Sequence, residues 1–258
     1  MPIIQHTGTA FASGGGDLNW ENPSTLQVWL DPRNWSSLTQ SSDAAFGAGS
    51  QSSGNWRIMN GDAQYVAGTN DQGVEPAVSN TNMATITYGN DVPGMRNVTN
   101  YTFQFWIYVG TQTHGSWGYI GGSSNFWGNR TAGIFIQSNG TDWGFHTSSD
   151  GALDNDMPAN GWHNVCGVRN ISAPNCRMLF VDGSVVRVDN NGDNDSSHIL
   201  DYSGGLSVLC HSNSNATGTG YTVGQTGFKF GHCLFYSSAL SEAQVLSNYN
   251  MSKSVYGL

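Results

Sequence analysis

The chain consists of short apolar or alternating runs separated by turns rich in Gly, Asn, Asp and Ser, a pattern typical of β-strands joined by tight connections. The most strand-prone run covers residues 101–109 (YTFQFWIYV), and its alternation puts Phe103, Phe105 and Ile107 on one face of a sheet. Further strands are predicted at 26–30, 56–59, 64–66, 84–88, 119–120, 133–137, 143–147, 206–209, 221–224 and 229–236. Many short strands without an internal repeat predict a single antiparallel β domain.

Residues 161–188 (GWHNVCGVRNISAPNCRMLFVDGSVVRV) predict a meander of three antiparallel strands at 162–168, 177–181 and 184–188. The first connection is polar, with Pro174 and Asn175 at its centre. The second connection is Asp182-Gly183, the dipeptide that supplies the two positive φ angles of a type I′ turn.

One helix is predicted, over residues 241–249. Ser241 and Gln244 have the spacing of a capping box. The apolar stripe expected along this helix consists of Ala243, Val245, Leu246 and Tyr249.

Four segments resemble the laminin-G-like, concanavalin A-like lectin/glucanase family, in the form found in bacteriophage structural proteins. They are the first strand with its Asp31-Pro32 stop, the FQFWIYV strand, the Trp-His-x-Val to Val-Asp-Gly meander, and the LSEAQVL segment at 240–246. The resemblance runs from about residue 25 to 250. It implies an all-β, antiparallel two-sheet jelly-roll sandwich, with an N-terminal arm at 1–24 and a domain at 25–258 that ends in a short helix.

Composition narrows the functional classes. Thirty-four Gly and only three Glu and two Lys argue against long helices, and charged residues make up 10% of the chain, against about 25% in a typical domain. The net charge of −9 disfavours nucleic acid as a partner, because phosphate binding needs clustered Lys and Arg. No apolar run approaches the ~20 residues of a membrane helix, so no membrane partner is expected.

The N-terminal segment 1–24 contains isolated apolar residues and the flexible triplet Gly14-Gly15-Gly16. Two interpretations stay open, a disordered tail or an arm held by its own domain or a neighbouring subunit, and the neighbour is favoured. No basic and apolar signal segment is recognised, so the chain is expected to be made in a host cytoplasm, or to reach the outside by another route. The four cysteines, Cys166, Cys176, Cys210 and Cys233, could form up to two disulfides, but free and largely buried thiols are favoured. No C-x-x-C spacing indicates zinc.

Catalytic chemistry is not expected. A retaining glycosidase needs two carboxylates about 5 Å apart, but Glu21, Glu75 and Glu242 are far apart in the sequence and no Glu-x-Asp-x-Glu strand occurs. No Ser lies in a Gly-x-Ser-x-Gly elbow. His163, in the Trp-His-x-Val strand, is interpreted as structural. A glycoside hydrolase is therefore disfavoured, and the protein is predicted to be a non-enzyme.

The Asp-rich segment 189–195 (DNNGDND) has carboxylates and an amide at alternate positions, which suits Ca²⁺ coordination. The candidate ligands are Asp189, Asn191, Asp193 and Asp195. The segment departs from an EF-hand loop, and a solvated turn is the alternative interpretation. Apart from this Ca²⁺ hypothesis, no cofactor is expected.

The stretch 114–131 (HGSWGYIGGSSNFWGNRT) places aromatic rings among Gly, Ser and Asn. Aromatic faces with amide partners are what a sugar-binding surface requires. The candidate carbohydrate contacts are Trp117, Tyr119, Asn125, Phe126, Trp127, Asn129 and Arg130. The alternative is that these rings pack the edge of the sandwich or a subunit contact.

These observations lead to two functional hypotheses. The first is a structural protein on the virion surface of a bacteriophage, a capsid decoration or a fibre/tail accessory, whose lectin-like domain binds host-surface glycans. Its partners would be other virion subunits, contacted through the arm, and further copies of itself, with a trimer as the first hypothesis. The second is a stand-alone carbohydrate-binding lectin-like module.

Overall fold

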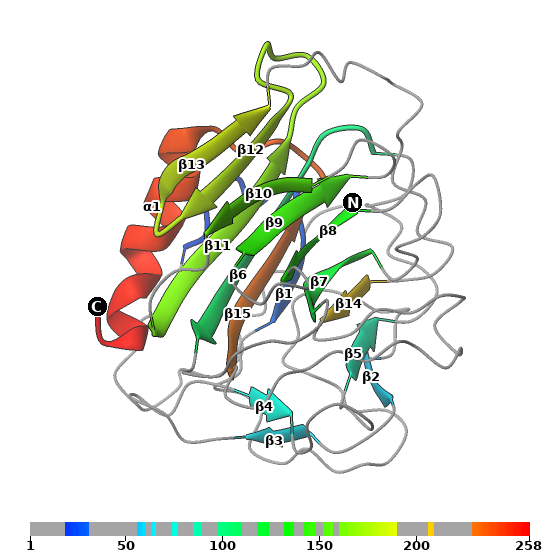
Figure 1. Ribbon diagram of the computed structural model, residues 1–258, viewed down its shortest axis with the longest axis vertical. Helices are drawn as coiled ribbons and strands as arrows, with labels where there is room; N and C mark the ends of the chain where they lie inside the picture. The colour runs from blue at the N-terminus through cyan, green and yellow to red at the C-terminus, as the bar shows by residue number, and fades with distance from the viewer. Residues whose placement is uncertain are drawn as a thin grey trace.

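The computed structural model describes residues 19–30, 56–59, 63–65, 74–76, 85–88, 98–109, 118–123, 132–136, 142–147, 152–156, 160–189, 206–208 and 229–258. Within these residues the protein is mostly β, and a short helix lies at its C-terminal end (Figure 1). The strand pairs in these ranges are antiparallel. The prediction of an antiparallel β protein with a C-terminal helix is confirmed.

Within the described ranges, the larger sheet has eight strands. Its order is β13 (Ser184–Asp189), β12 (Arg177–Val181), β11 (Gly161–Arg169), β6 (Tyr101–Val109), β15 (Lys229–Tyr236), β4 (Val74–Pro76) and β3 (Ala63–Tyr65), and β1 (Leu26–Leu30) also pairs with β15. Strand β15 therefore carries β6 on one edge, and both β1 and β4 on the other.

The smaller sheet has seven strands in the part of the chain that the structure describes. Its order is β10 (Ala152–Asp156), β9 (Asp142–Thr147), β8 (Ala132–Ile136), β7 (Gly118–Ser123), β14 (Leu206–Val208), β5 (Thr85–Tyr88) and β2 (Trp56–Met59). Strands β1, β2, β6, β12 and β15 have the bounds that the sequence pattern predicts, and other predicted strands shift by one to three residues. Strands β4 and β10 were not predicted, and the strand expected at 221–224 lies outside the described residues.

The two sheets meet through an aromatic core. Phe103 and Phe105 point to one side of β6, as predicted, and both pack edge-on against Phe235 of β15. Phe145 of β9 comes from the smaller sheet and contacts Phe103 edge-on, with ring centroids 6.4 Å apart. Gly167 of β11 makes room for this ring, since a Cβ there would lie 2.4 Å from Phe145. All four rings are fully buried, so burial of the aromatic surface holds the sheets together.

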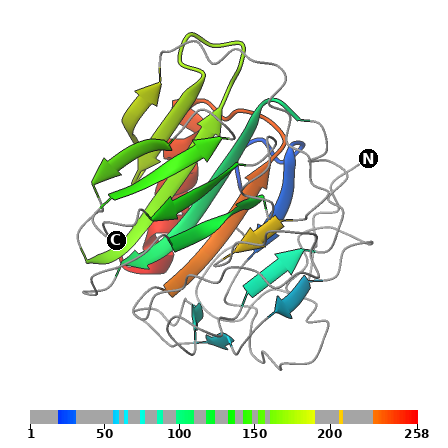
Figure 2. The same cartoon turned by 45° about the vertical axis from the view of Figure 1, so that its right-hand side comes forward.

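The opposite face of the larger sheet is also buried, by helix α1 (Glu242–Ser252) and the residues around Trp20. Figures 1 and 2 show α1 (red) on one side of this sheet and strands β8 to β10 (green) on the other. Every residue of β6 except Tyr108 is buried as a result. An antiparallel sheet commonly has one solvated face, but here the central strands have none.

The buried face of α1 differs from the prediction. Val245 is fully buried, but Leu246 is 43% exposed, so the expected apolar stripe is wrong in part. Asn248 and Ser252 lie on the buried face instead. Their polar groups are satisfied there, because Asn248 hydrogen-bonds across to the sheet and Ser252 Oγ accepts a hydrogen bond from Trp106 Nε1 at 2.9 Å. The helix continues into a 3₁₀ turn at Lys253–Tyr256.

The Asp182-Gly183 turn has the predicted geometry, with φ values of 51° and 77°. Gly183 also contacts α1: a Cβ at this position would lie 2.8 Å from Leu246 Cδ1 and 3.2 Å from Tyr249 Cβ. The turn therefore needs glycine for its backbone conformation and for the close approach of the hairpin to the helix.

The described end of the expected arm, residues 19–24, packs on its own domain. Trp20 is buried and packs edge-on against His232, with centroids 5.4 Å apart. The backbone N–H of Glu21 donates to Asn248 Oδ1 at 2.8 Å, and Ser247 Oγ donates to a Glu21 carboxylate oxygen at 2.7 Å. The chain thus reaches β1 along the same side of the larger sheet as α1. Residues 1–18 lie outside the described ranges.

Candidate functional site

The predicted sugar-binding residues fall mainly outside the described part of the chain. The backbone of Tyr119 lies in β7, opposite Phe135 of β8. Trp117, Asn125, Phe126, Trp127, Asn129 and Arg130 are not among the described residues. Carbohydrate binding by this stretch therefore stays a prediction from the sequence.

Of the proposed calcium ligands, the structure describes Asp189. It ends β13 opposite Arg177, and its Oδ2 accepts hydrogen bonds from Arg177 Nη2 and, at 3.0 Å, from Arg177 Nε. Arg177 also donates to Thr147 Oγ1 of the smaller sheet at 3.0 Å. Both members of the ion pair are buried, so this carboxylate neutralises a buried guanidinium.

Asn191, Asp193 and Asp195 lie outside the described ranges, and calcium binding stays a prediction. Within the described ranges, no group of three or more His, Cys, Asp or Glu side chains could hold a metal ion. In the same ranges, no helix is long and apolar enough to cross a membrane.

His163 is held by the hairpin turn, which fits the structural role expected for it. Its Nδ1 lies 2.9 Å from Asp182 Oδ2, while Asp182 Oδ1 accepts a hydrogen bond from the Asn164 backbone N–H, also at 2.9 Å. The Asp182 N–H in turn donates to the Asn164 carbonyl at 2.8 Å. This cluster fastens the tip of the β12–β13 hairpin to β11.

Three cysteines, Cys166, Cys176 and Cys233, are buried free thiols, as the sequence predicts, and Cys210 lies outside the described residues. Burial raises the pKa of the Cys166 and Cys233 thiols well above the usual value. Both therefore stay protonated near neutral pH, and a protonated thiol is neither a nucleophile nor a good metal ligand.

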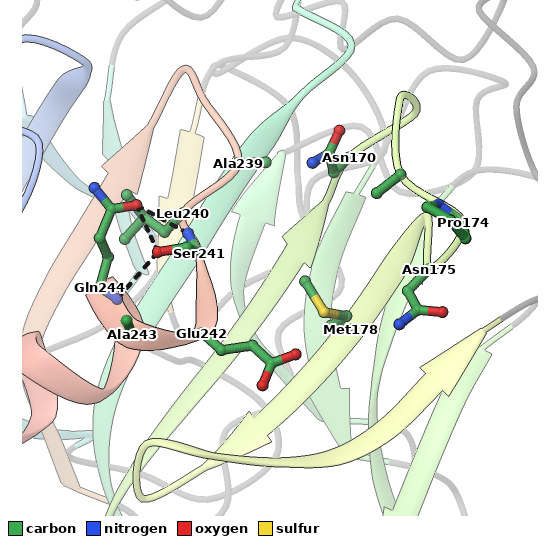
Figure 3. A pocket seen from close by; sticks show the side chains of 11 residues that line it. Asn170, Pro174, Asn175, Met178, Ala239, Leu240, Ser241, Glu242, Ala243 and Gln244 are labelled. Atoms are coloured by element: carbon green, nitrogen blue, oxygen red, sulfur yellow. Dashed lines mark hydrogen bonds between the residues drawn. The ribbon is translucent and has the colours of Figure 1, made fainter.

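An open groove of about 510 Å³ lies where the turn between β11 and β12 faces the residues that lead into α1 (Figure 3). Residues 170–175 form one wall, residues 239–244 form the other, and Met178 of β12 lies between them. The lining residues are Asn170, Ala173, Pro174, Asn175, Met178, Ala239, Leu240, Ser241, Glu242, Ala243 and Gln244.

Hydrogen bonds fix the helix side of the groove. The predicted capping box is present: Ser241 Oγ accepts from the Gln244 N–H at 3.3 Å, and Gln244 Oε1 accepts from the Ser241 N–H at 2.9 Å. Directly before Ser241 in the chain, the Leu240 N–H donates to Thr102 Oγ1 at 2.9 Å, and this hydroxyl donates to the Ser238 carbonyl at 2.9 Å. The wall is thus tied to the central strand β6.

The turn side of the groove is fixed in the same way. The Asn170 N–H donates to the Cys176 carbonyl at 2.7 Å, which closes the turn. Asn170 Oδ1 accepts from the Ser172 N–H at 3.1 Å, and Asn100 Oδ1 accepts from the Ile171 N–H at 2.9 Å. Both walls are therefore set before any ligand arrives.

Glu242 is the one charged residue among the described residues that line the groove. Figure 3 shows its carboxylate directed toward the side that carries Met178 and Asn175. Within the described part of the chain, no hydrogen bond or ion pair engages the Glu242 carboxylate or the Asn175 side-chain amide. The groove thus combines free hydrogen-bonding groups with an apolar contribution from Pro174 and Met178.

The groove is not predicted by the sequence. Pro174 and Asn175 were predicted as turn residues and Ser241 with Gln244 as a helix cap, and the structure confirms both predictions. Nothing in the sequence indicates that the two segments, more than sixty residues apart, face one another across β12.

No protein-family model matches the chain. No curated protein matches it either. The resemblance to laminin-G-like proteins therefore rests on the four sequence segments.

Among solved structures, the chain is similar to the receptor-binding domain of botulinum neurotoxin C/D mosaic serotype, with a TM-score of 0.59 and 13% identity over 88% of this chain and 51% of that chain. A structure described as "Cell entry of botulinum neurotoxin type C is dependent upon interaction with two ganglioside molecules" gives a TM-score of 0.58 and 11% identity over 88% of this chain and 51% of that one.

The chain is also similar to Trypanosoma rangeli sialidase in complex with 2,3-difluorosialic acid, with a TM-score of 0.52 and 12% identity over 78% of this chain and 29% of that chain. The chain thus spans about half the length of the neurotoxin structures and less of the sialidase. At this identity the likeness shows a shared β fold.

Proposed function

We propose that the protein is a non-enzymatic carbohydrate-binding domain with a lectin-like jelly-roll sandwich. The observation that carries the proposal is the likeness of fold to botulinum neurotoxin structures, one described as a receptor-binding domain and another with cell entry that depends on interaction with two ganglioside molecules. The aromatic stretch 114–131 supports it from the sequence, because Trp117 and Trp127 offer ring faces on which a pyranose can stack. The missing Glu-x-Asp-x-Glu motif supports binding without hydrolysis.

A glycan array probed with the labelled full chain tests this function. The expected result is selective binding to a small group of glycans, weakened at least tenfold in the Trp117→Ala and Trp127→Ala variants. Asn250→Ala, an exposed helix residue that does not line the groove, serves as the folded control and should bind like the wild type. An array on which the wild type binds no glycan would exclude the function.

We further propose that the domain is exposed on the exterior of a bacteriophage particle. The low charge content and the Gly-containing arm support this setting, since an arm can tie a subunit to its neighbours. Glu21 hydrogen-bonds to residues of α1, and in this proposal the tether begins on that side of the domain. Mass spectrometry of purified particles should find the chain at a fixed copy number, and light scattering of the free chain should give three times the monomer mass. Absence from particles would refute the setting and leave carbohydrate binding intact.

A further inference from the structure

We propose that the groove between residues 170–175 and 239–244 binds a neutral sugar residue, with Glu242 and Asn175 as its hydrogen-bonding groups. The proposal rests on the carbohydrate-binding function above and adds a site that shares no residue with the aromatic stretch 114–131. Three features of the groove support it: its charge, its free polar groups and its fixed walls.

Charge selects the class of ligand. Among the described residues that line the groove there is no Lys, Arg or His, and Glu242 repels phosphate, sulfate and carboxylate groups. At the N-terminus of α1, the Gln244 N–H already donates to Ser241 Oγ and is not available to an anion. An acidic sugar such as sialic acid is therefore disfavoured, and an uncharged ligand is favoured.

Hydrogen-bonding capacity selects among uncharged ligands. An ionised carboxylate accepts only, whereas the Asn175 amide both donates and accepts. Neighbouring sugar hydroxyls match this pair, since one can donate to Glu242 while another exchanges hydrogen bonds with Asn175. Because no described group engages either side chain, no internal hydrogen bond of the protein must break first.

The remaining lining gives the ligand an apolar contact. Pro174, Ala173 and the thioether of Met178 can pack against the C–H face of a pyranose, and methionine adapts readily to such a surface. The groove volume of about 510 Å³ falls within the roughly 300–1,000 Å³ of small-molecule sites. Because hydrogen bonds already fix both walls, binding orders few additional groups.

NMR titration of the ¹⁵N-labelled full chain with methyl glucoside, methyl galactoside and methyl mannoside tests the site. At least one of these neutral probes should shift the amide signals of residues 170–175 and 239–244 in a saturable way, and N-acetylneuraminic acid should not. Glu242→Gln, which keeps the shape of the side chain, should raise the Kd at the groove about tenfold, because hydrogen bonds to a charged group are stronger. Asn175→Ala should raise it several-fold, and Asn250→Ala should leave it unchanged.

The outcomes separate this site from the proposed function. Saturable shifts at 114–131 with none in the groove would overturn the groove and leave carbohydrate binding in place. Groove shifts that Glu242→Gln does not weaken would overturn the assignment of that carboxylate. No saturable shift anywhere, together with an array without hits, would overturn both. Thermal melting of each variant confirms that a lost signal does not reflect unfolding.

Discussion

The buried amide of Asn248 is expected to be among the most important polar groups for stability. Its Nδ2 donates to Gln104 Oε1 at 2.9 Å and to Tyr236 OH at 3.0 Å, and its Oδ1 accepts from the Glu21 backbone N–H at 2.8 Å. One side chain thus links α1 to strands β6 and β15 and to the N-terminal segment. Asn248 has no exposed surface, and Gln104 is 1% exposed.

We predict that Asn248→Ala lowers the free energy of unfolding by about 2–4 kcal/mol. Each buried polar group that loses its partner costs about 1–3 kcal/mol. Gln104 and Tyr236 are buried and lose such a partner, whereas Glu21 lies closer to solvent and should contribute less. Alanine recovers a few tenths of a kcal/mol through its helix propensity, which does not change the sign.

The assay is urea unfolding followed by tryptophan fluorescence, with Asn250→Ala as the control because it makes the same change on the exposed side of the same helix. The control should stay within about 0.5 kcal/mol of the wild type. Gln104→Ala combined with Asn248→Ala should cost about 1 kcal/mol less than the sum of the single changes, since the two residues share a hydrogen bond. A loss below 1 kcal/mol for Asn248→Ala would refute the reasoning.

Three further predictions concern the core. Gly167→Ala should lower the melting temperature by several degrees, because the added Cβ would lie 2.4 Å from Phe145 and overpacking of this kind costs about 1–3 kcal/mol. An unchanged melting curve would contradict the packing between the sheets. Asp189→Asn should lower the free energy of unfolding, measured by urea titration, by about 3–5 kcal/mol, because it leaves the Arg177 guanidinium buried without its carboxylate. A decrease under about 1 kcal/mol would mean that another group compensates the Arg177 charge. Burial raises the pKa of the Cys233 thiol, so the folded state keeps this proton at a pH where the unfolded state has lost it. The free energy of unfolding should therefore fall above about pH 8.5 by ~1.4 kcal/mol per pH unit. In urea unfolding curves measured between pH 8 and 10, Cys233→Ala should remove this part of the pH dependence.

Local elements were predictable because their causes lie within a few residues. The alternation in 101–109 identifies strand β6 to the residue, and Asp182-Gly183 identifies its turn, because positive φ angles at adjacent positions exclude most residue pairs. The capping box of α1 is local as well, since Ser241 and Gln244 are three positions apart. Strands β4 and β10 were missed because VEP and ALDND carry little strand propensity, and pairing with neighbouring strands defines them.

Burial on the second face of the larger sheet could not be predicted in the same way. The polar residues Gln104 and Asn248 have the pattern of solvent-facing positions, yet each is buried, because the other supplies its hydrogen bond. That compensation joins positions 144 residues apart. An apolar stripe containing Leu246 was the natural expectation for α1, and only the packing of the helix shows which side faces inward.

The features of the fold and of the candidate site fall into two groups, those that the sequence predicts and those that depend on tertiary contacts. The sequence by itself determined the β class of the chain, its C-terminal helix, its hairpin turn and the aromatic stretch 114–131, because each depends on residue type and spacing within one segment. Only the tertiary structure brought the 170–175 turn opposite Glu242, buried both faces of the central strands, and committed Asp189 to Arg177. These features depend on contacts between segments distant in sequence, which follow from how the sheets and the helix pack.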